Sequence, residues 1–369
     1  MASKIFTLIL FVGIFSTVQA QDPSFSQFYA NRIYLNPALT GLEAGLSFAG
    51  IYRMQWKNVD NGFRSYSASV ESQEPYINSG LGLTLYQDVE GIMELTTTSV
   101  GFSYAYTLKG ENHNVHIGFQ AEWVQKSLDW SKIVFSDQLD PVFGVVNPST
   151  ALNGMERVTY TDFHMGAAWR FNNDLELGKR LIQDIQTNIG FSIHHVPHLF
   201  SNTGGNESLQ NLETNTPPRL TIHAGTIIPT YVFGGSKQKI AISPNLKYDI
   251  QGDDLLNTKE NLQVFTAGSY VLYEGLYVGA FYQNKFLTAG FQHTNALILA
   301  LGAYIDSGRK DKGHFFIGFS YDANTTGVGL RGGGVYELAF RWTMADAPAL
   351  FGGRRKSTSR KTLDCYKFF

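Results

Sequence analysis

The last regular stretch of the chain, Gly313 to Thr343, alternates apolar side chains with small or polar ones. A period of two places successive side chains on opposite faces of a β-strand. The alternation breaks at 323–327, which includes the turn formers Asn324 and Gly327, and then resumes in the opposite phase. The apolar positions are Phe315, Ile317, Phe319, Tyr321, Val328, Leu330, Tyr336, Leu338, Phe340 and Trp342. We therefore predict a β-hairpin with one apolar face.

Soluble β-sandwiches and membrane β-barrels both show this alternation, so the hairpin alone leaves the environment open. Composition narrows it: 43% of residues are hydrophobic, 14% aromatic and only 16% charged, whereas about a quarter are charged in globular chains. The best apolar run in the rest of the chain, Ala296 to Ile305, is about half the ~20 residues of a membrane helix. These features favour a membrane β-barrel or a large secreted all-β protein. The net charge of −2 argues against nucleic-acid binding.

Residues 1–20 are typical of a secretory signal peptide. Lys4 gives the positive start, Ile5 to Val18 the apolar core, and Val18-Gln19-Ala20 a small-residue cleavage site. The next residue, Gln21, is not the cysteine that bacterial lipid attachment at that site would need. The only cysteine, Cys365, allows no intramolecular disulfide. We expect an exported protein.

Residues 47–343 repeat the alternation often enough to close a barrel. We predict an all-β fold, a transmembrane antiparallel β-barrel of about 14 strands in the outer membrane. Phe286 to His293 is an ambiguous fifteenth strand. Three of the fourteen predicted strands are apolar on both faces: 262–272, 275–283 and 296–305. The predicted strands are 47–56, 64–72, 80–88, 99–108, 115–123, 163–171, 188–194, 219–232, 239–250, 262–272, 275–283, 296–305, 315–322 and 328–343.

The connections support an even strand number. If the chain starts in the periplasm, the odd-numbered connections face outward and should be the longer ones. The two longest, Val124 to Val158 and Val196 to Pro218, follow the fifth and seventh strands. The longest inward connection is Asn172 to Asp184.

The segments that flank the barrel have different compositions. Residues 21–46 begin QDPSFSQFYANRIYLNPALTG, which is rich in aromatics but alternates poorly, so we predict an ordered periplasmic lead-in packed on the barrel. Residues 344–369 form a basic periplasmic tail, either solvated or docked on an acidic partner or on lipid head groups. Fourteen strands also leave room in the lumen for a plug or an inserted loop.

The lead-in, Gln21 to Gly41, and the end blocks IGFSYD and GGGVYELAFRW resemble the PorP/SprF family of type IX secretion system outer-membrane proteins. Weaker family-like blocks are YRMQW, GLGLTLYQDVEG, YAYTLKG and IGFSIHHVPH. The chain departs from the family at its end, where a Cys-Pro-containing motif often stands and this sequence reads Cys365-Tyr366-Lys367-Phe368-Phe369.

The resemblance implies a barrel that secretes a large cell-surface adhesin or anchors it. A SprF-like branch serves gliding motility; a PorP-like branch works with the periplasmic ring of the secretion machine. The expected partners are an adhesin-like client, the ring components and outer-membrane lipid. The family-motif residues that we predict to face partners are Phe25, Phe28, Tyr29, Tyr34, Asn36, Pro37, Tyr321, Asp322 and Glu337.

Charged residues on the predicted inward faces could form a salt-bridged lumen. They are Arg53, Glu71, Glu122, Arg170, Lys247, Asp249, Glu337 and Arg341. His164, His194, His195 and His198 raise the question of a metal site. Neighbours in a strand point to opposite faces, and no carboxylate stands beside these histidines at a ligand-like spacing, so we expect no metal and no other cofactor. Nor does a nucleophile motif predict an enzyme.

Two other hypotheses remain. A diffusion porin would conduct solutes through its lumen and would give the aromatic lead-in no role. A soluble secreted β-protein would be released from membranes without detergent. The leading hypothesis is a non-enzymatic outer-membrane barrel that binds a client with its long outward loops.

Overall fold

The computed structural model describes residues 22–351 with short gaps, so the predicted signal peptide and most of the basic tail lie outside the described residues. The gaps are 60–61, 92–93, 131–133, 135, 141, 147–155, 178–179, 201–206, 208, 210–215, 232–238, 254, 256–260, 288–291, 307–312, 326–328 and 345–346. In the described part, no helix has the length and apolar character needed to cross a bilayer.

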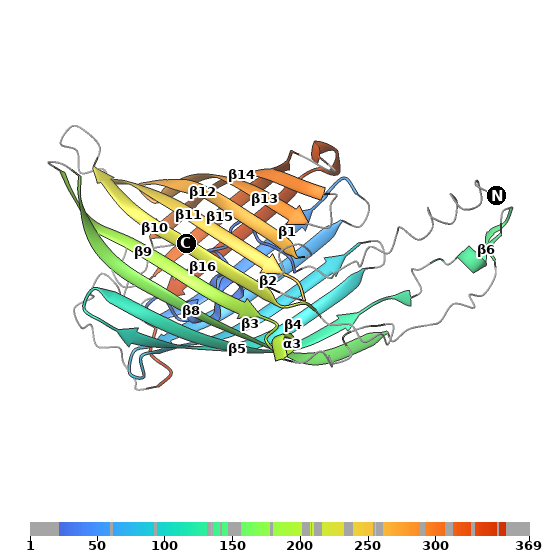
Figure 1. Cartoon of the computed structure of the whole chain (residues 1–369), viewed down its shortest axis with the longest axis horizontal. Helices are drawn as coiled ribbons and strands as arrows, with labels where there is room; N and C mark the ends of the chain where they lie inside the picture. The colour runs from blue at the N-terminus through green and yellow to red at the C-terminus, as the bar shows by residue number, and fades with distance from the viewer. Residues whose placement is uncertain are drawn as a thin grey trace, which may run out of the picture.

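Fourteen antiparallel strands close into one barrel (Figure 1). Each strand pairs with its neighbours in sequence, and the first and last strands pair to close the ring, with Arg53 opposite Glu337. The predicted antiparallel barrel of about fourteen strands is confirmed. The strands are β1 (Leu46–Gln55), β2 (Phe63–Glu74), β3 (Ser79–Glu90), β4 (Leu95–Lys109), β5 (His113–Ser127), β8 (Arg157–Leu177), β9 (Arg180–His194), β10 (Arg219–Tyr231), β11 (Lys239–Gln251), β12 (Leu262–Tyr273), β13 (Leu276–Leu287), β14 (Gln292–Asp306), β15 (His314–Asn324) and β16 (Val335–Met344).

The strands turn their apolar side chains outward and their small and polar side chains into the lumen. On β4, Phe102 is 51% exposed, whereas Ser103 is fully buried. On β16, Phe340 is 47% exposed and its neighbour Arg341 is 3% exposed. A contiguous apolar outer surface of this kind needs a lipid environment, and a closed barrel with this surface is the type that spans outer membranes.

Three details of the predicted strands were wrong. Phe286 belongs to the end of β13 and His293 to the start of β14, so the described residues of 286–293 form no separate fifteenth strand. Asn172 to Asp184 is not a loop, because β8 and β9 extend through it and pair as far as Leu177 and Arg180; 178–179 lie outside the described residues. Leu330 lies in a short 3-10 helix, η4 (Gly329–Gly332), and β16 starts only at Val335; Val328 lies outside the described residues.

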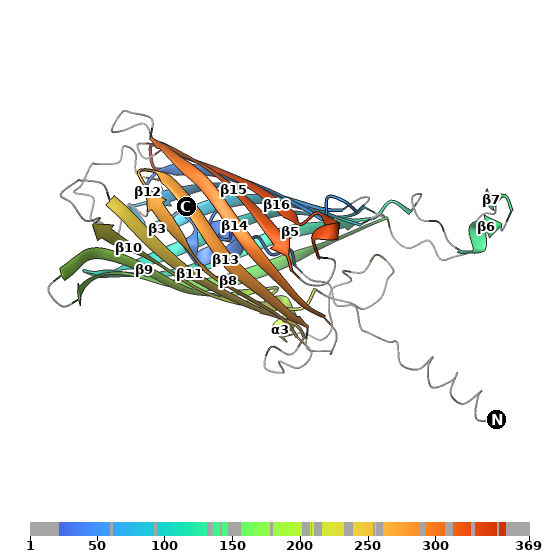
Figure 2. The ribbon, with the colours of Figure 1, turned by 90° about the horizontal axis from the view of Figure 1, so that it is seen from above.

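The two ends of the barrel differ. We call the end where β1, β3, β5, β9, β11, β13 and β15 finish the long-loop end, and the opposite end the short-turn end. The long-loop end carries the connections 128–156 and 195–218, with η3 (Ser136–Gln138), the hairpin β6 (Leu139–Asp140) and β7 (Gly144–Val145), and α3 (Pro197–Phe200). Figures 1 and 2 show β6 and α3 at this same end, with β6 far from the barrel.

Residues 22–43 lie inside the barrel, and we call them the plug. They include two single turns of helix, α2 (Arg32–Leu35) and η1 (Pro37–Leu39), and all residues from Phe25 to Glu43 except Tyr34 are buried or nearly so. The predicted packing of this segment on the barrel from the periplasm is therefore corrected: it fills the lumen. The reason is that the barrel offers it an inward surface of matching shape and charge.

Glycines on the inner wall let the plug approach closely. A Cβ at Gly118 of β5 would lie 2.3 Å from the plug backbone at Pro37 and Ala38, and one at Gly80 of β3 would lie 2.1 Å from the carbonyl oxygen of Thr40. Opposite this glycine wall, β12–β15 turn large apolar groups inward, and Tyr270, Tyr277, Phe281, Ile298 and Phe316 pack with Phe28 and Tyr29 in one cluster. This packing explains why three predicted strands are apolar on both faces.

Candidate functional site

The plug begins at the long-loop end, where Asp22 is tied to the barrel by three contacts. Its backbone N–H donates to Oε1 of Gln251 at 3.1 Å, and its carboxylate lies 2.9 Å from Nη1 of Arg219 and 2.9 Å from Nε2 of His195. Burial alone would raise the pKa of this carboxyl, but the two cations outweigh it and hold the pKa well below its usual range. The start of the plug is therefore fixed at the long-loop end.

His195 stands between two carboxylates. Its Nε2 contacts Asp22, and its Nδ1 contacts Asp162 of β8. Burial alone would lower the pKa of His195, but Asp22 and Asp162 raise the pKa to about 10. At neutral pH His195 is thus an imidazolium that joins the plug to the barrel wall.

Asp162, His164 and His195 bring potential ligand atoms within 4.8 Å of one another. The predictions that no carboxylate accompanies these histidines and that His194 and His195 point to opposite faces were wrong. His195 follows the end of β9 with φ at +60°, so His194 and His195 both line the same cavity, together with Asp162. However, both ring nitrogens of His195 contact carboxylates, and Nδ1 of His164 accepts the backbone N–H of His195 at 3.1 Å. The contacts fit an imidazolium between two carboxylates better than a metal centre.

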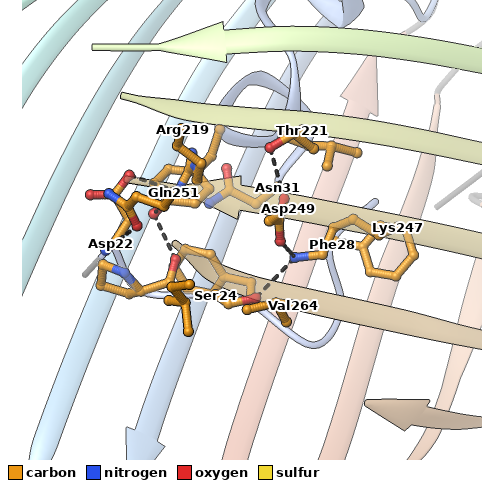
Figure 3. Close-up of a pocket in the computed structure, with 15 residues that line it drawn as sticks. Asp22, Ser24, Phe28, Asn31, Arg219, Thr221, Lys247, Asp249, Gln251 and Val264 are labelled. Carbon is orange, nitrogen blue, oxygen red and sulfur yellow. Dashed lines mark hydrogen bonds and ion pairs between the residues drawn. The ribbon is translucent and has the colours of Figure 1, made fainter. Parts of the chain in front are cut away.

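Beside Asp22, Lys247 of β11 makes a further contact between the plug and the same wall (Figure 3). Its Nζ donates to Oγ of Ser24 and lies 2.9 Å from Oδ2 of Asp249, whose other oxygen accepts from Thr221 at 2.7 Å. Only about 30 Å³ of space remains there. This contact set leaves no passage beside Asp22 on that side.

Glu337 of β16 holds the middle of the plug. Its two oxygens accept the backbone N–H groups of Ser26 at 2.7 Å and Gln27 at 2.9 Å, and Oε1 also pairs with Arg53 of β1. Ser26 further contacts Asp322 through its hydroxyl. A carboxylate that accepts two backbone donors and a guanidinium is a strong, geometrically specific anchor.

At the short-turn end, Glu43 joins the plug to the last strand. It pairs with Arg32 within the plug and lies 3.7 Å from Nη1 of Arg341, while Thr343 donates to its second oxygen at 2.6 Å. Burial alone would raise the pKa of Glu43, but Arg32 and Arg341 lower the pKa to about 2. Plug and barrel are therefore joined by buried charges at both ends and in the middle.

The structure places eight of the nine predicted family-motif residues in the lumen and one outside it. Asn36 is fully buried, and its Nδ2 donates to the carbonyl oxygens of Ala167 and Phe191. Tyr321 packs on Tyr336 at a ring distance of 5.0 Å, among the outward-facing side chains of β15 and β16. The eight lumen residues, which contact the barrel or the plug rather than an outside surface, are Phe25, Phe28, Tyr29, Tyr34, Asn36, Pro37, Asp322 and Glu337.

All the predicted lumen charges face the lumen, but only some of them meet. Arg53 pairs with Glu337, Lys247 with Asp249, and Arg341 with Glu71 at 3.6 Å. Glu122 lies 3.6 Å from His164. Arg170 lines a small gap at the short-turn end. The sequence did not predict the roles of Asp22, Arg32, Glu43, Asp162 and Arg219. The first three belong to a segment without strand periodicity, Asp162 lies just before the predicted strand 163–171, and Arg219 is the first residue of β10.

The sequence matches a protein-family model described as "Type IX secretion system membrane protein PorP/SprF" over residues 17–342. The chain belongs to the PorP/SprF family. This confirms the resemblance seen in the lead-in and the end blocks. No protein with a curated function matches the sequence significantly.

Solved structures share the general barrel form at low similarity. The CymD monoaromatic hydrocarbon channel has 12% identity and a TM-score of 0.40, over 85% of this chain and 92% of its own. A Pseudomonas aeruginosa FadL homologue has 12% identity and a TM-score of 0.39, over 84% and 93%.

Proposed function

We propose that this PorP/SprF protein is a plugged outer-membrane barrel that holds a large secreted adhesin-like client at the cell surface, as the SprF-like branch does in gliding. In this proposal the long-loop end faces the cell exterior. Outer-membrane barrels have short periplasmic turns and longer extracellular loops, and the connections 128–156 and 195–218 both leave the long-loop end.

The observation that carries the proposal is the plug. A lumen crossed by buried ion pairs offers no route for a polypeptide or for solutes, so the surface available to a client is the long-loop end. Asp22, Glu337 and Glu43 fix the plug at three levels of the barrel. Removing one partner from a buried pair typically costs about 3–5 kcal/mol, so a plug of this kind does not open spontaneously. This argues against the diffusion porin.

The β6–β7 hairpin supplies an apolar surface suited to a protein client. Val142 is 80% exposed and Phe143 is 77% exposed. Oδ1 of Asp140 accepts the backbone N–H groups of both residues, at 2.8 and 2.9 Å, so the tip is ordered before any partner arrives. Exposed apolar groups on such a preorganised loop are typical of protein-binding sites.

A second candidate is the PorP-like role of contacting the periplasmic ring. The start of the tail favours it, because the backbone N–H groups of Leu350 and Phe351 donate to the carboxylate of Glu74 at 3.0 Å. This contact keeps two exposed apolar side chains at the short-turn end, and basic residues follow them in the sequence.

Affinity purification in mild detergent from outer membranes of the source bacterium distinguishes these roles. We expect one large surface protein to copurify, and its yield to fall in the variant Val142→Asp/Phe143→Asp. Leu350→Asp/Phe351→Asp is the matched control at the opposite end. Recovery of ring proteins that depends on Leu350 and Phe351 would replace the proposal with the PorP-like role. Recovery of neither, with pore conductance in planar bilayers, would leave the porin.

A further inference from the structure

A cavity of about 310 Å³ opens beside the plug in the long-loop half of the lumen. Asp22, Pro23 and Tyr34 of the plug form one side, and β3, β4, β5, β8, β9 and the loop before β10 form the rest. Its volume is in the range of about 300–1,000 Å³ that binding sites in proteins occupy. It is also much larger than the gaps of about 20–60 Å³ elsewhere in the described lumen.

The lining of this cavity is acidic. Six carboxylates face it, against two permanently charged bases, Lys126 and Arg219. Four of the six have a histidine beside them: Asp22 and Asp162 contact His195, Glu207 contacts His198 at 2.8 Å, and Glu122 lies 3.6 Å from His164. Both bases are engaged as well, Arg219 with Asp22 and Lys126 with Glu207 at 3.9 Å.

Asp88 and Glu90 are the two carboxylates left over. They stand two positions apart on β3 and therefore point to the same side of the strand. Asp88 is 3% exposed and accepts the hydroxyl of Ser65, and among the described residues no basic nitrogen comes within ion-pair distance of either carboxylate. Burial of carboxylates without a cation is costly, so a cation delivered from outside would stabilise this wall.

The aromatic residues of the cavity suit an organic cation. Arg219 already lies over the ring of Tyr34 at 4.9 Å, and Lys126 over that of Tyr160 at 5.2 Å. Tyr86, stacked on Tyr34 at 5.6 Å, also lines the cavity, and its hydroxyl interacts with Asp88. A buried hydroxyl beside two carboxyl groups that have no cation is a preformed set of groups for a hydrogen-bonding cation.

We propose that this cavity binds a basic side chain, Arg or Lys, of the client polypeptide, with Asp88 and Glu90 as its ion-pair partners and Tyr86 as its hydrogen-bond partner. The inference rests on the proposed function, because it assigns the client's contact point at the long-loop end. The floor of the cavity is the start of the plug, so the client would touch barrel and plug together.

Calorimetric titration of the full-length protein in detergent tests the proposal, with two capped tripeptides as probes, Gly-Arg-Gly and Gly-Gln-Gly. We expect Gly-Arg-Gly to bind and Gly-Gln-Gly not to bind at the same concentrations. Asp88→Asn/Glu90→Gln should weaken Gly-Arg-Gly at least tenfold. The matched control Glu111→Gln/Glu274→Gln removes two charges at exposed positions outside the cavity and should leave binding unchanged. Heat-modifiability on gels verifies that each variant is folded.

Two outcomes of the titration would overturn the cavity assignment: no binding of Gly-Arg-Gly to the unmodified protein, or equal binding by the folded Asp88→Asn/Glu90→Gln variant. Surface display of the client in cells separates this from the proposed function. Loss of display on deletion of the protein, with full display in Asp88→Asn/Glu90→Gln, would exclude the cavity as the client's contact point and support the client-holding role. Full display after deletion would remove the client-holding role itself.

Discussion

Glu337 and Arg53 face each other across the seam where the first and last strands of the barrel meet, and their ion pair also anchors the plug. The carboxylate of Glu337 thus pairs with a side chain across the β1–β16 seam and also accepts the backbone N–H groups of Ser26 and Gln27. Barrel closure and plug insertion are therefore coupled, since the same oxygens serve both.

Glu337→Gln should destabilise the folded barrel by about 3 kcal/mol, because it leaves the guanidinium of Arg53 buried without a full counter-charge. The measurement is the unfolding midpoint in detergent, read from heat-modifiability or from intrinsic fluorescence. Glu111→Gln, an exposed position, is the control and should change stability little. The double variant Arg53→Met/Glu337→Gln, which removes the buried guanidinium and keeps an acceptor for the plug backbone, should lose less than the single variant; a larger loss would contradict the buried-charge explanation.

Gly118→Val should expel the plug from its seat. The new Cβ would lie 2.3 Å from plug backbone atoms, which cannot move aside as a flexible side chain would, and overpacking of this kind costs about 1–3 kcal/mol. We expect a lower unfolding midpoint and new ion conductance in planar bilayers. Ala121→Val, on the outward face of the same strand, is the control. Unchanged stability together with a closed barrel in Gly118→Val would show that the plug does not press on β5.

The sequence predicted the barrel because each strand has one lipid face and one lumen face, which imposes a period of two. It did not predict that residues 22–43 lie in the lumen, because a segment without periodicity gives no direction of packing. Two signals did exist: inward glycines such as Gly118, and strands such as Leu276–Leu287 whose inward face is as apolar as the outer one. The β8–β9 extension was missed because its polar sequence, from Asn172 to Asp184, lacks the one-sided apolar pattern of a lipid-facing strand.

The anchor at Asp22 should weaken at alkaline pH. The pKa of His195 is raised to about 10 in the folded protein, above about 6.5 for a free histidine. Its contribution to stability is therefore complete below about pH 6.5 and is lost as the pH rises towards 10. The titratable or charged groups that act on His195 or surround it are Asp22, Asp162, His164, His194 and Arg219.

Unfolding midpoints measured between pH 6 and pH 10.5 test this linkage. We expect a decline across that window in the unmodified protein and a flatter profile in His195→Gln. His113→Gln, at the exposed start of β5, should keep the original slope. Parallel profiles for the unmodified protein and His195→Gln would mean that the imidazolium does not hold the plug.

The direction in which the plug crosses the lumen predicts which residues are accessible from each side of the membrane. The chain enters the lumen at the long-loop end with Asp22 and leaves it at the short-turn end with Glu43, so the plug starts on the side of the long loops. If that side is the cell exterior, Pro23→Cys in a Cys365→Ser background should react with a membrane-impermeant maleimide on intact cells, more slowly than Val142→Cys. Glu274→Cys, in an exposed turn at the short-turn end, should react only after the cells are broken.

Labelling of Glu274→Cys but not Val142→Cys on intact cells would mean that the short-turn end, and not the long-loop end, faces the cell exterior. Labelling of Val142→Cys with Pro23→Cys protected even in broken cells would mean that the cavity beside Asp22 is closed to solvent, and a client could not then reach Asp88 and Glu90.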